Sequence, residues 1–350
     1  MPIYKDQNRG TWFCKFNYKD WQGKIKQKKK EGFKTQKEAK EFERDFLNKA
    51  KADCDIVFNN LVELYLEDCR SRLKPTTLNN KTYSINKNIL PYFKEQPINK
   101  ITPAMVRTWQ NELINKEYSQ TYLKTIHTQL SAVFNYAVKY YNLSSNPAAI
   151  CGSMGKQNAD SMQFWTKEEF KLFLEAIKDN LISKAAFSIL FWTGIRSGEL
   201  LGLRLNDFDF INKRLLIRRN YARLKESDLF LEPKTQKSRR SIAIPAFLCD
   251  IVKEYAAKLY EYEANQRLFM ITKYYLKREM DSGCKKSGVK RIRIHDLRHS
   301  HASLLIELGF SPLLIAERLG HEKVETTLQI YAHLYPNKHS EVAEKLEELY

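Results

Sequence analysis

Four segments in the second half of the sequence concentrate side chains that suit a reaction at a phosphodiester. They read TGIRSGEL, EPKTQKSRRSIAIP, HDLRHSHAS and LGHEKVETTLQIYAH. Six of their residues are the candidates for this chemistry, namely two arginines, two histidines, one lysine and one tyrosine: Arg196, Arg298, His295, His321, Lys234 and Tyr331. The reaction needs charge stabilisation on the nonbridging oxygens, a proton donor for the leaving oxygen and an oxygen nucleophile, and this set holds candidates for all three.

The arginines and the tyrosine are the candidates for the attack itself. Attack builds negative charge on the equatorial oxygens, and a guanidinium meets two oxygens where an ammonium offers one point of charge. Arg196 and Arg298 are therefore predicted to clamp the phosphate, although a structural pairing of Arg196 with Glu199 is the alternative. A phenol, with an ordinary pKa of about 10, is a poor nucleophile, but neighbouring guanidinium groups would favour its anion. Tyr331 is the predicted nucleophile.

A lysine on a predicted hairpin is the candidate proton donor. The leaving deoxyribose hydroxyl requires a proton, which Lys234 could supply if nearby arginines lower its pKa. Other basic residues lie close by, and any of them could be a solvated surface charge: Lys225, Lys237, Arg239 and Arg240. Arg239 and Arg240 are predicted to contact DNA.

The two histidines are the candidates for proton shuttling and phosphate binding. His295 stands three residues before Arg298, so on a helix the two share a face, and His295 could shuttle a proton for Tyr331. His321 follows Gly320, a predicted helix end from which its imidazole could bond to the phosphate. If one unbroken helix ran from His321 to Tyr331, both side chains would lie on nearly one face.

Three histidines in one segment also permit a metal site as an interpretation. His295, His299 and His301 could be ligands, but Arg298 among them would repel a cation, and no cysteine or paired carboxylate completes a ligand set. No metal site is therefore predicted, and His299 is assigned to packing or to support of the active residues.

Periodicity over residues 162–350 predicts the elements that must position these side chains. Helical patterns occupy WTKEEFKLFLEAIKDN, with a capping box at Thr166 and Glu169, and AAFSILFWTGIRSGELLGL. Short strands are predicted in DFDFINKRLLIRR, LFLEPK and SIAIP, and the tail returns to helices. The predicted class is mostly α with small β elements, an α+β fold.

Residues 53–150 are predicted to form a helical domain of four amphipathic helices. Prolines fall between the helical segments or in their first turns, where a missing amide hydrogen costs least. Thr102 and Pro103 predict a helix start, and Asn146 and Pro147 are predicted to close the last helix. The small and polar residues 151–161 are predicted to be a linker.

Residues 1–52 are predicted to form a small sheet followed by a helix, with a capping box at Thr35 and Glu38. The first 50 residues hold 14 Lys and Arg against 7 Asp and Glu. A solvated basic face is the simpler interpretation, but the aromatic residues interleaved on the sheet favour a DNA-contacting module. The predicted DNA contacts are Lys24, Lys28, Lys29 and Lys30.

The whole chain of 350 residues carries a formal charge of +18, which indicates a polyanionic partner. Its six cysteines form no close pair, which favours buried thiols in a reducing compartment. No apolar run is long enough to span a bilayer, and the start lacks the layout of a signal peptide. A cytoplasmic protein is expected.

These motifs resemble the catalytic domain of the tyrosine recombinases, the integrases of phages and conjugative transposons. The resemblance covers about residues 162–335 and rests on a Thr-Gly-x-Arg-x-Gly-Glu box, a hairpin lysine, His-x-Leu-Arg-His, and Leu-Gly-His with a tyrosine ten residues on. It implies that the six residues named above fill the family's active-site roles and that Glu199 supports the first arginine. Residues 1–52 resemble an arm-type DNA-binding domain, residues 53–150 a core-binding domain, and residues 162–350 a catalytic domain with a C-terminal tail.

The resemblance implies a site-specific recombinase for a mobile genetic element. Tyr331 would form a 3′-phosphotyrosyl link and release a 5′-hydroxyl, which attacks the partner duplex through a Holliday junction, without a metal or a nucleotide cofactor. The implied partners are double-stranded DNA at core and arm sites, further copies in a homotetramer, and as accessory proteins an excisionase and a host DNA-bending protein. The implied location is the bacterial cytoplasm, in association with the nucleoid when bound to DNA. The alternatives are a DNA-binding regulator without catalysis and a type IB topoisomerase-like strand passer.

Overall fold

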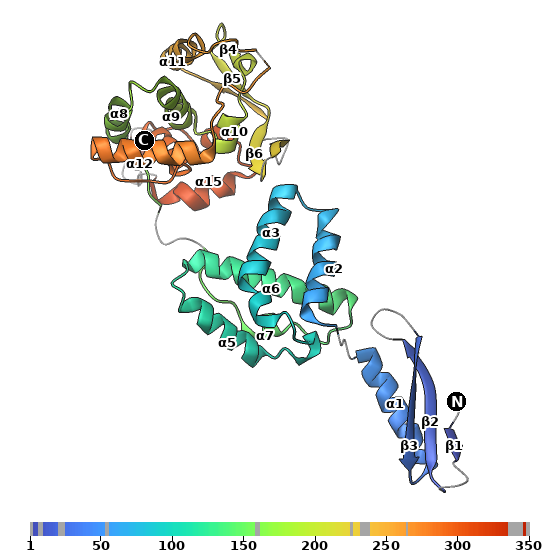
Figure 1. Ribbon diagram of the computed structural model, residues 1–350. Coiled ribbons are helices and arrows are strands. Elements are labelled where there is room, and N and C mark those ends of the chain that lie inside the picture. Colours follow the sequence, from blue (N-terminus) through green and yellow to red (C-terminus); the bar gives the residue numbers. More distant parts are fainter. Residues whose placement is uncertain are drawn as a thin grey trace. The chain divides into compact units, whose positions relative to one another are not determined.

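The computed structural model describes residues 3–5, 10–19, 25–52, 56–157, 162–224, 227–231, 239–263, 265–334 and 346–347. The chain divides into two compact units, residues 1–160 and residues 161–350 (Figure 1). The first unit contains the predicted arm and core-binding regions, and the second contains all six predicted active-site residues. None of the helices in the described ranges is long and apolar enough to cross a membrane.

A three-stranded antiparallel sheet and one helix form the N-terminal part of the chain. Its elements are β1 (Ile3–Lys5), β2 (Trp12–Lys19), β3 (Ile25–Phe33) and α1 (Gln36–Ala52), with the strands in the order β1-β2-β3. The helix begins where predicted, because the Thr35 hydroxyl accepts a hydrogen bond from the Glu38 amide at 3.2 Å. Cys14, Phe16 and Ala39 are buried where α1 lies against the sheet (Figure 1).

The register of β2 and β3 places two of the predicted DNA contacts beside this helix. Directly paired residues point to the same face of a sheet. Cys14 pairs with Lys30 and Phe16 pairs with Lys28, so both lysines lie on the face that α1 covers. The Lys30 ammonium lies 5.8 Å from the centroid of the Phe42 ring of α1. These two lysines therefore flank the small core of this domain.

The opposite face of the sheet carries a different set of polar side chains. Lys29 pairs with Lys15 there, and Asn17 pairs with Gln27, whose amide donates a hydrogen bond to it at 3.2 Å. All four side chains are exposed, and we refer to them as the outer sheet face: Lys15, Asn17, Gln27 and Lys29. Lys24, a further predicted DNA contact, lies outside the described residues.

The four long helices predicted for the core-binding region are present, together with two short ones. The helices are α2 (Phe58–Arg70), α3 (Pro75–Asn88), α4 (Leu90–Phe93), α5 (Pro103–Ile114), α6 (Gln120–Tyr140) and α7 (Pro147–Cys151). Thr102 caps α5 as predicted, since its hydroxyl accepts from the Met105 amide at 3.3 Å. The prediction that Asn146 closes the last long helix was wrong. Its side chain accepts hydrogen bonds from the amides of Ala148 and Ala149, so Asn146 caps the start of α7.

In the described residues of the second unit, helices are combined with two small antiparallel sheets. One sheet has the order β4-β5-β8 and the other pairs β6 with β7. The strands are β4 (Phe208–Asp209), β5 (Arg214–Ile217), β6 (Asn220–Leu224), β7 (Ser227–Leu231) and β8 (Arg240–Ala243). The helices are α8 (Lys167–Ala176), α9 (Leu181–Thr193), α10 (Ser197–Leu201), α11 (Ala246–Ala256), α12 (Lys273–Ser287), α13 (Asp296–Glu307), α14 (Pro312–Leu319) and α15 (Val324–Tyr331). The predicted class, mostly α with small β elements, is confirmed.

A glycine divides the segment that the sequence predicted as one helix around Arg196. Helix α9 ends at Thr193 because Gly194 adopts the left-handed conformation with φ of 65°, which favours glycine. A Cβ atom at this position would lie 2.7 Å from side-chain atoms of His301 and Leu319. The break places Arg196 at the N-cap of α10 instead of inside a helix.

A second glycine separates His321 from the helix that carries Tyr331. Gly320 ends α14 with φ of 70°, and α15 begins only at Val324. One unbroken helix from His321 to Tyr331 is therefore not formed. His321 instead lies between the two helices, and its Nδ1 atom is 2.8 Å from the Thr327 hydroxyl of α15.

Candidate active site

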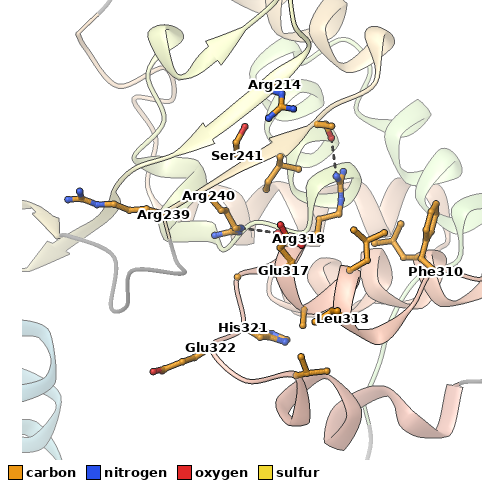
Figure 2. Close-up of a pocket in the computed structure, with 17 residues that line it drawn as sticks. Arg214, Arg239, Arg240, Ser241, Phe310, Leu313, Glu317, Arg318, His321 and Glu322 are labelled. Carbon is orange, nitrogen blue, oxygen red and sulfur yellow. Dashed lines mark hydrogen bonds between the residues drawn. The ribbon is translucent and has the colours of Figure 1, made fainter.

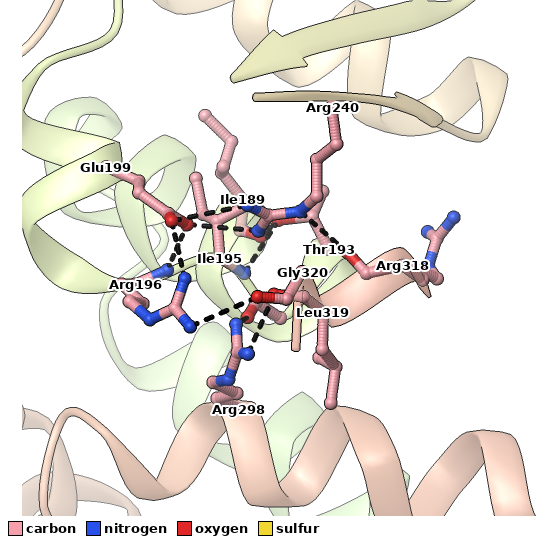
Figure 3. A network of polar contacts seen from close by, with 11 residues as sticks. Ile189, Thr193, Ile195, Arg196, Glu199, Arg240, Arg298, Arg318, Leu319 and Gly320 are labelled. Atoms are coloured by element: carbon pink, nitrogen blue, oxygen red, sulfur yellow. Dashed lines mark hydrogen bonds and ion pairs between the residues drawn. The ribbon is translucent and has the colours of Figure 1, made fainter. Parts of the chain in front are cut away.

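Two arginines meet at one buried carboxylate. Glu199 of α10 receives hydrogen bonds from the Arg196 guanidinium at 2.8 Å and from Arg240 of β8 at 3.0 and 3.2 Å (Figure 3). The same carboxylate accepts from the backbone amide of Arg196 at 2.9 Å. Burial by itself raises the pKa of Glu199, but Arg240 and Arg196 outweigh it and the pKa is lowered. The carboxylate is therefore ionised and fixes both guanidinium groups.

Arg298 approaches the same place from α13. It is 3% exposed, and its guanidinium donates to the carbonyl oxygens of Gly194 at 2.8 Å and Leu319 at 2.7 Å (Figure 3). Arg196 donates to the next carbonyl, that of Gly320, at 3.4 Å. The ends of α9 and α14 thus hold the two predicted phosphate clamps side by side, because each helix leaves carbonyl groups unsatisfied at its end.

The charges around this point are unbalanced. Burial, followed by repulsion from Arg196, lowers the pKa of Arg298 to about 9, so it stays largely protonated at neutral pH. Arg318 is also buried in part, and it donates to the carbonyls of Trp192 and Ala243. Within the described residues, no carboxylate lies within ion-pair distance of Arg298 or Arg318. Arg196 and Arg240 bond to Glu199, and Arg298 interacts with its charge at longer range, so three guanidinium groups surround this carboxylate. A phosphate would restore the balance.

Tyr331 lies beside this cluster with its hydroxyl engaged. The residue is 1% exposed and packs with Ala302, Ile306 and Leu319. Its hydroxyl lies 2.7 Å from Nδ1 of His299. Burial raises the pKa of Tyr331 to about 12, although Arg298 acts in the opposite direction. The expectation that the arginines favour the phenolate is therefore not met here, since desolvation is the larger effect.

His295 and His321 both flank the arginines as neutral imidazoles. His295 is the N-cap of α13, and burial of its ring, with His299 and Arg298, lowers its pKa to about 4. Burial and the arginines, Arg298 foremost, also lower the pKa of His321 to about 4. Each ring can therefore donate one hydrogen bond to a phosphate oxygen at neutral pH without carrying a charge of its own.

Arg240 and Arg239 differ, although both were predicted to contact DNA. The Arg240 side chain is 6% exposed and is committed to Glu199 and to the Arg318 carbonyl at 2.9 Å, so it points into the domain. The burial of its guanidinium gives it a role in positioning Glu199 rather than the surface contact that its place in a basic run predicted. Arg239 is exposed and stands just before β8.

A cavity of about 970 Å³ opens beside the arginine cluster (Figure 2). Arg239, Arg240 and His321 line one side, and Phe310 and Leu313 line the other. The basic side of the cavity is continuous with the residues that surround Glu199. The apolar side belongs to the turn before α14 and to α14 itself.

Lys234 lies outside the described residues, in the stretch that joins β7 to β8. Five of the six predicted active-site residues can therefore be placed: Arg196, His295, Arg298, His321 and Tyr331. All five lie in the second unit, where helices begin or end. Arg196 precedes α10, His295 and Arg298 lie at the start of α13, His321 lies between α14 and α15, and Tyr331 ends α15. In the described ranges no group of three or more His, Cys, Asp or Glu is placed to hold a metal ion.

Sequence reasoning missed two residues that support the cluster, Arg318 and Thr327. Arg318 donates a hydrogen bond to Nε2 of His301 at 3.0 Å and links α13 to α14, whereas the sequence shows only one more arginine on a helix. Thr327 orients the His321 ring. His299, which was assigned to packing or support, contacts the hydroxyl of Tyr331. No periodicity in the sequence distinguishes these residues from their neighbours, although the adjacency of His299 to Arg298 was visible.

The fold and the cluster define a class, the tyrosine recombinases, and comparison with known proteins establishes the family. Residues 163–338 match the phage integrase family, residues 57–114 match the N-terminal SAM-like domain of phage integrases, and residues 2–50 match an arm DNA-binding domain. The chain therefore belongs to the phage integrase family.

Relatives of similar length support this assignment. The chain is 34% identical over 342 residues to the ICEBs1 integrase of Bacillus subtilis (strain 168), with 90% of each chain covered. It is 27% identical to a XerC-like tyrosine recombinase of Caldanaerobacter subterraneus subsp. tengcongensis, covering 95% of this chain and 94% of the relative. Its fold resembles that of the Tn1549 transposon integrase in complex with a circular intermediate DNA, with a TM-score of 0.69, 18% identity, and coverage of 84% of this chain and 100% of the other. A lambda integrase dimer bound to a core site gives a TM-score of 0.63 at 18% identity, with 93% of each chain covered.

Proposed function

We propose that this protein is a site-specific DNA recombinase that integrates and excises a mobile genetic element, with Tyr331 as its nucleophile. The observation that carries the proposal is the grouping of three guanidinium groups around the Glu199 carboxylate, with the Tyr331 hydroxyl within the electrostatic reach of Arg298. Its similarity to the ICEBs1 integrase supports the proposed role as an integrase.

The proposed reaction exchanges one phosphodiester for another. The Tyr331 oxygen attacks phosphorus, the bond from phosphorus to the 5′-oxygen breaks, and the released 5′-hydroxyl takes a proton for which Lys234 is the proposed donor. Arg196 and Arg298 stabilise the charge on the nonbridging oxygens, and His321 and His295 donate hydrogen bonds to the phosphate. A 5′-hydroxyl from the partner strand then attacks the 3′-phosphotyrosyl link and releases the tyrosine. Because Tyr331 is 1% exposed, bound DNA must open access to its hydroxyl.

The proposed DNA contacts fall on both units. Arg239 and the catalytic cluster serve the core site, and the outer sheet face serves the arm site, since a sheet can enter a DNA groove with its exposed side chains. Lys28 and Lys30 are proposed to touch phosphate only from the edge of the sheet, and Lys24 remains a prediction. We also propose that the protein acts as a homotetramer with an excisionase and a host DNA-bending protein, and that it associates with the bacterial nucleoid when bound to DNA.

A nicked suicide duplex tests the nucleophile. The nick lets the short 5′-fragment diffuse away, so a covalent complex of protein and DNA accumulates and is counted on a denaturing gel. Full-length protein is incubated with duplexes that carry the candidate ends of its element, in EDTA. We expect wild-type protein to form the adduct and Tyr331→Phe to form none while it binds the duplex with unchanged affinity.

Tyr255→Phe is the matched control, because it removes another buried tyrosine hydroxyl in the same unit, one that donates to the Leu268 carbonyl. This variant should keep the adduct. An undiminished adduct with Tyr331→Phe would assign the nucleophile to another residue. DNA binding without any adduct in the wild type would favour a regulator, and relaxation of supercoiled DNA without exchange between two duplexes would favour a topoisomerase.

A further inference from the structure

A histidine that the proposed reaction does not use makes the shortest polar contact to the nucleophile. Nδ1 of His299 lies 2.7 Å from the Tyr331 hydroxyl, and the two rings are arranged edge to face with their centroids 5.6 Å apart. His299 lies on the first turn of α13, next to Arg298, while Tyr331 ends α15. The contact therefore joins the helix that holds a phosphate clamp to the helix that holds the nucleophile.

Burial and two neighbouring arginines keep the His299 ring neutral. Burial has the largest effect and lowers the pKa of His299, Asp296 acts to raise it, and Arg293 and Arg298 lower it further. The ring also lies near His295, whose centroid is 5.4 Å away, and near the phenol itself. With the proton of the neutral ring on Nε2, the unprotonated Nδ1 faces the phenol and accepts its hydrogen bond.

The phenol needs such an acceptor. Burial raises the pKa of Tyr331 to about 12, so at neutral pH its oxygen holds its proton until the attack begins. Asp296 is the nearest carboxylate on the same helix, but its two oxygens are bonded to the amide and guanidinium of Arg293. His295, which the sequence favoured for this task, contacts the ring of His299 and stands one turn before it.

We propose that His299 is a catalytic residue that accepts the phenolic proton of Tyr331. As the bond from oxygen to phosphorus forms, the O–H bond of Tyr331 breaks and its proton moves to Nδ1. The ring becomes an imidazolium, while the 5′-oxygen leaves with a proton from a separate donor. When the partner 5′-hydroxyl attacks, the proton returns to the departing Tyr331 oxygen. This inference rests on the proposed function, since it requires Tyr331 to be the nucleophile.

Two substitutions separate proton transfer from the positioning of the phenol. His299→Asn retains a polar atom at the place of Nδ1 but cannot accept the proton, whereas His299→Leu removes the contact. Single-turnover formation of the adduct is measured with full-length protein on the nicked duplex between pH 5.5 and 9, with saturating protein and with DNA affinity measured in parallel. We expect both variants to bind DNA as the wild type does and to cleave about 100-fold more slowly at pH 7.

The dependence of the cleavage rate on pH tests whether His299 accepts the phenolic proton. The wild-type rate should be constant around neutral pH and should fall in acid as His299 becomes protonated. The His299→Asn rate should instead climb by about tenfold per pH unit, because only the rare phenolate can attack. A His299→Asn variant that cleaves within threefold of the wild type, or with a parallel profile, would overturn the proposal and leave His299 a structural residue.

A modified substrate assigns the proton to the nucleophile rather than to the leaving group. A duplex with sulfur in place of the bridging 5′-oxygen has a leaving group that needs no proton, so it should restore cleavage by Lys234→Ala and leave His299→Asn slow. If the sulfur substrate restored cleavage by His299→Asn, the histidine would act on the proton of the leaving group, which would contradict the proposal. An adduct formed by Tyr331→Phe would overturn the proposed function itself, which makes the two failures distinguishable.

Discussion

Basic side chains are used in opposite ways in the arm region and in the catalytic unit. On the outer sheet face the Lys29 side chain is 52% exposed, whereas Arg298 is 3% exposed and is held by two backbone carbonyls. An exposed ammonium is hydrated and screened, so it adds affinity for any phosphate along a duplex. A buried guanidinium is held in one orientation and can stabilise one particular distribution of charge. Net charge therefore predicts a DNA partner, while burial indicates where chemistry takes place.

The strongest test of this contrast is Arg298→Lys. Lysine keeps the charge but cannot bridge the carbonyls of Gly194 and Leu319 and still face a phosphate. We expect the single-turnover cleavage rate to fall by about 100-fold to 1000-fold, with DNA affinity changed by less than about tenfold. Arg278→Lys, on the exposed face of α12, is the control and should cleave normally. An equal decrease in affinity and rate would remove the distinction between buried and exposed charge.

Glu199→Gln tests whether the arginine cluster depends on its carboxylate. The amide leaves the buried Arg240 and the partly exposed Arg196 without a counter charge, so we expect the free energy of unfolding of the second unit to fall by about 3 kcal/mol. Urea unfolding of the full chain measures it. Glu175→Gln, whose partner Lys178 is exposed, should change stability by less than about 0.5 kcal/mol. A stable Glu199→Gln variant would mean that the arginines are held by the backbone alone.

Acid should abolish the stabilisation from Glu199. Because its pKa is lowered in the folded protein, its ionisation stabilises the fold at every pH above the ordinary value of 4.5. This contribution is lost as pH falls from that value through the lowered pKa. The stability difference between wild type and Glu199→Gln should therefore be constant from pH 8 to about pH 5.5 and should shrink in stronger acid. A difference that persists unchanged to pH 3 would contradict the charge-based origin.

The arm region should show the smallest effect, and one that depends on salt. Lys15→Gln combined with Lys29→Gln should weaken binding to arm DNA and reduce the slope of log affinity against log salt by about 0.9 for each phosphate that is no longer neutralised. Cleavage of a core duplex should be unchanged. The matched control, Lys28→Gln with Lys30→Gln, alters the face that α1 covers and should reduce the slope less. Equal slopes for the two pairs would mean that the register of the sheet does not select the binding face.

Much of this organisation was predictable because it is local. The alternation of β2, the capping residues Thr35 and Thr102 and the prolines at helix starts depend on near neighbours, and these elements formed where expected. The motif spacing also indicated the right family. The helix end at Gly320 was predicted from the glycine itself. The break at Gly194 appeared as helix because the sequence does not reveal that His301 and Leu319 pack against this position.

The amino-acid sequence by itself determined the chemical inventory, the basic charge and the class of fold, since residue types and local periodicity carry that information. The resemblance of its motifs to those of known proteins indicated the family. Only the tertiary structure decided that Arg240 is buried against Glu199, that His299 rather than His295 contacts Tyr331, and that burial raises the pKa of the phenol. These properties depend on groups that are 32 to 41 residues apart in the chain, so desolvation and contact between them exist only after the helices have packed.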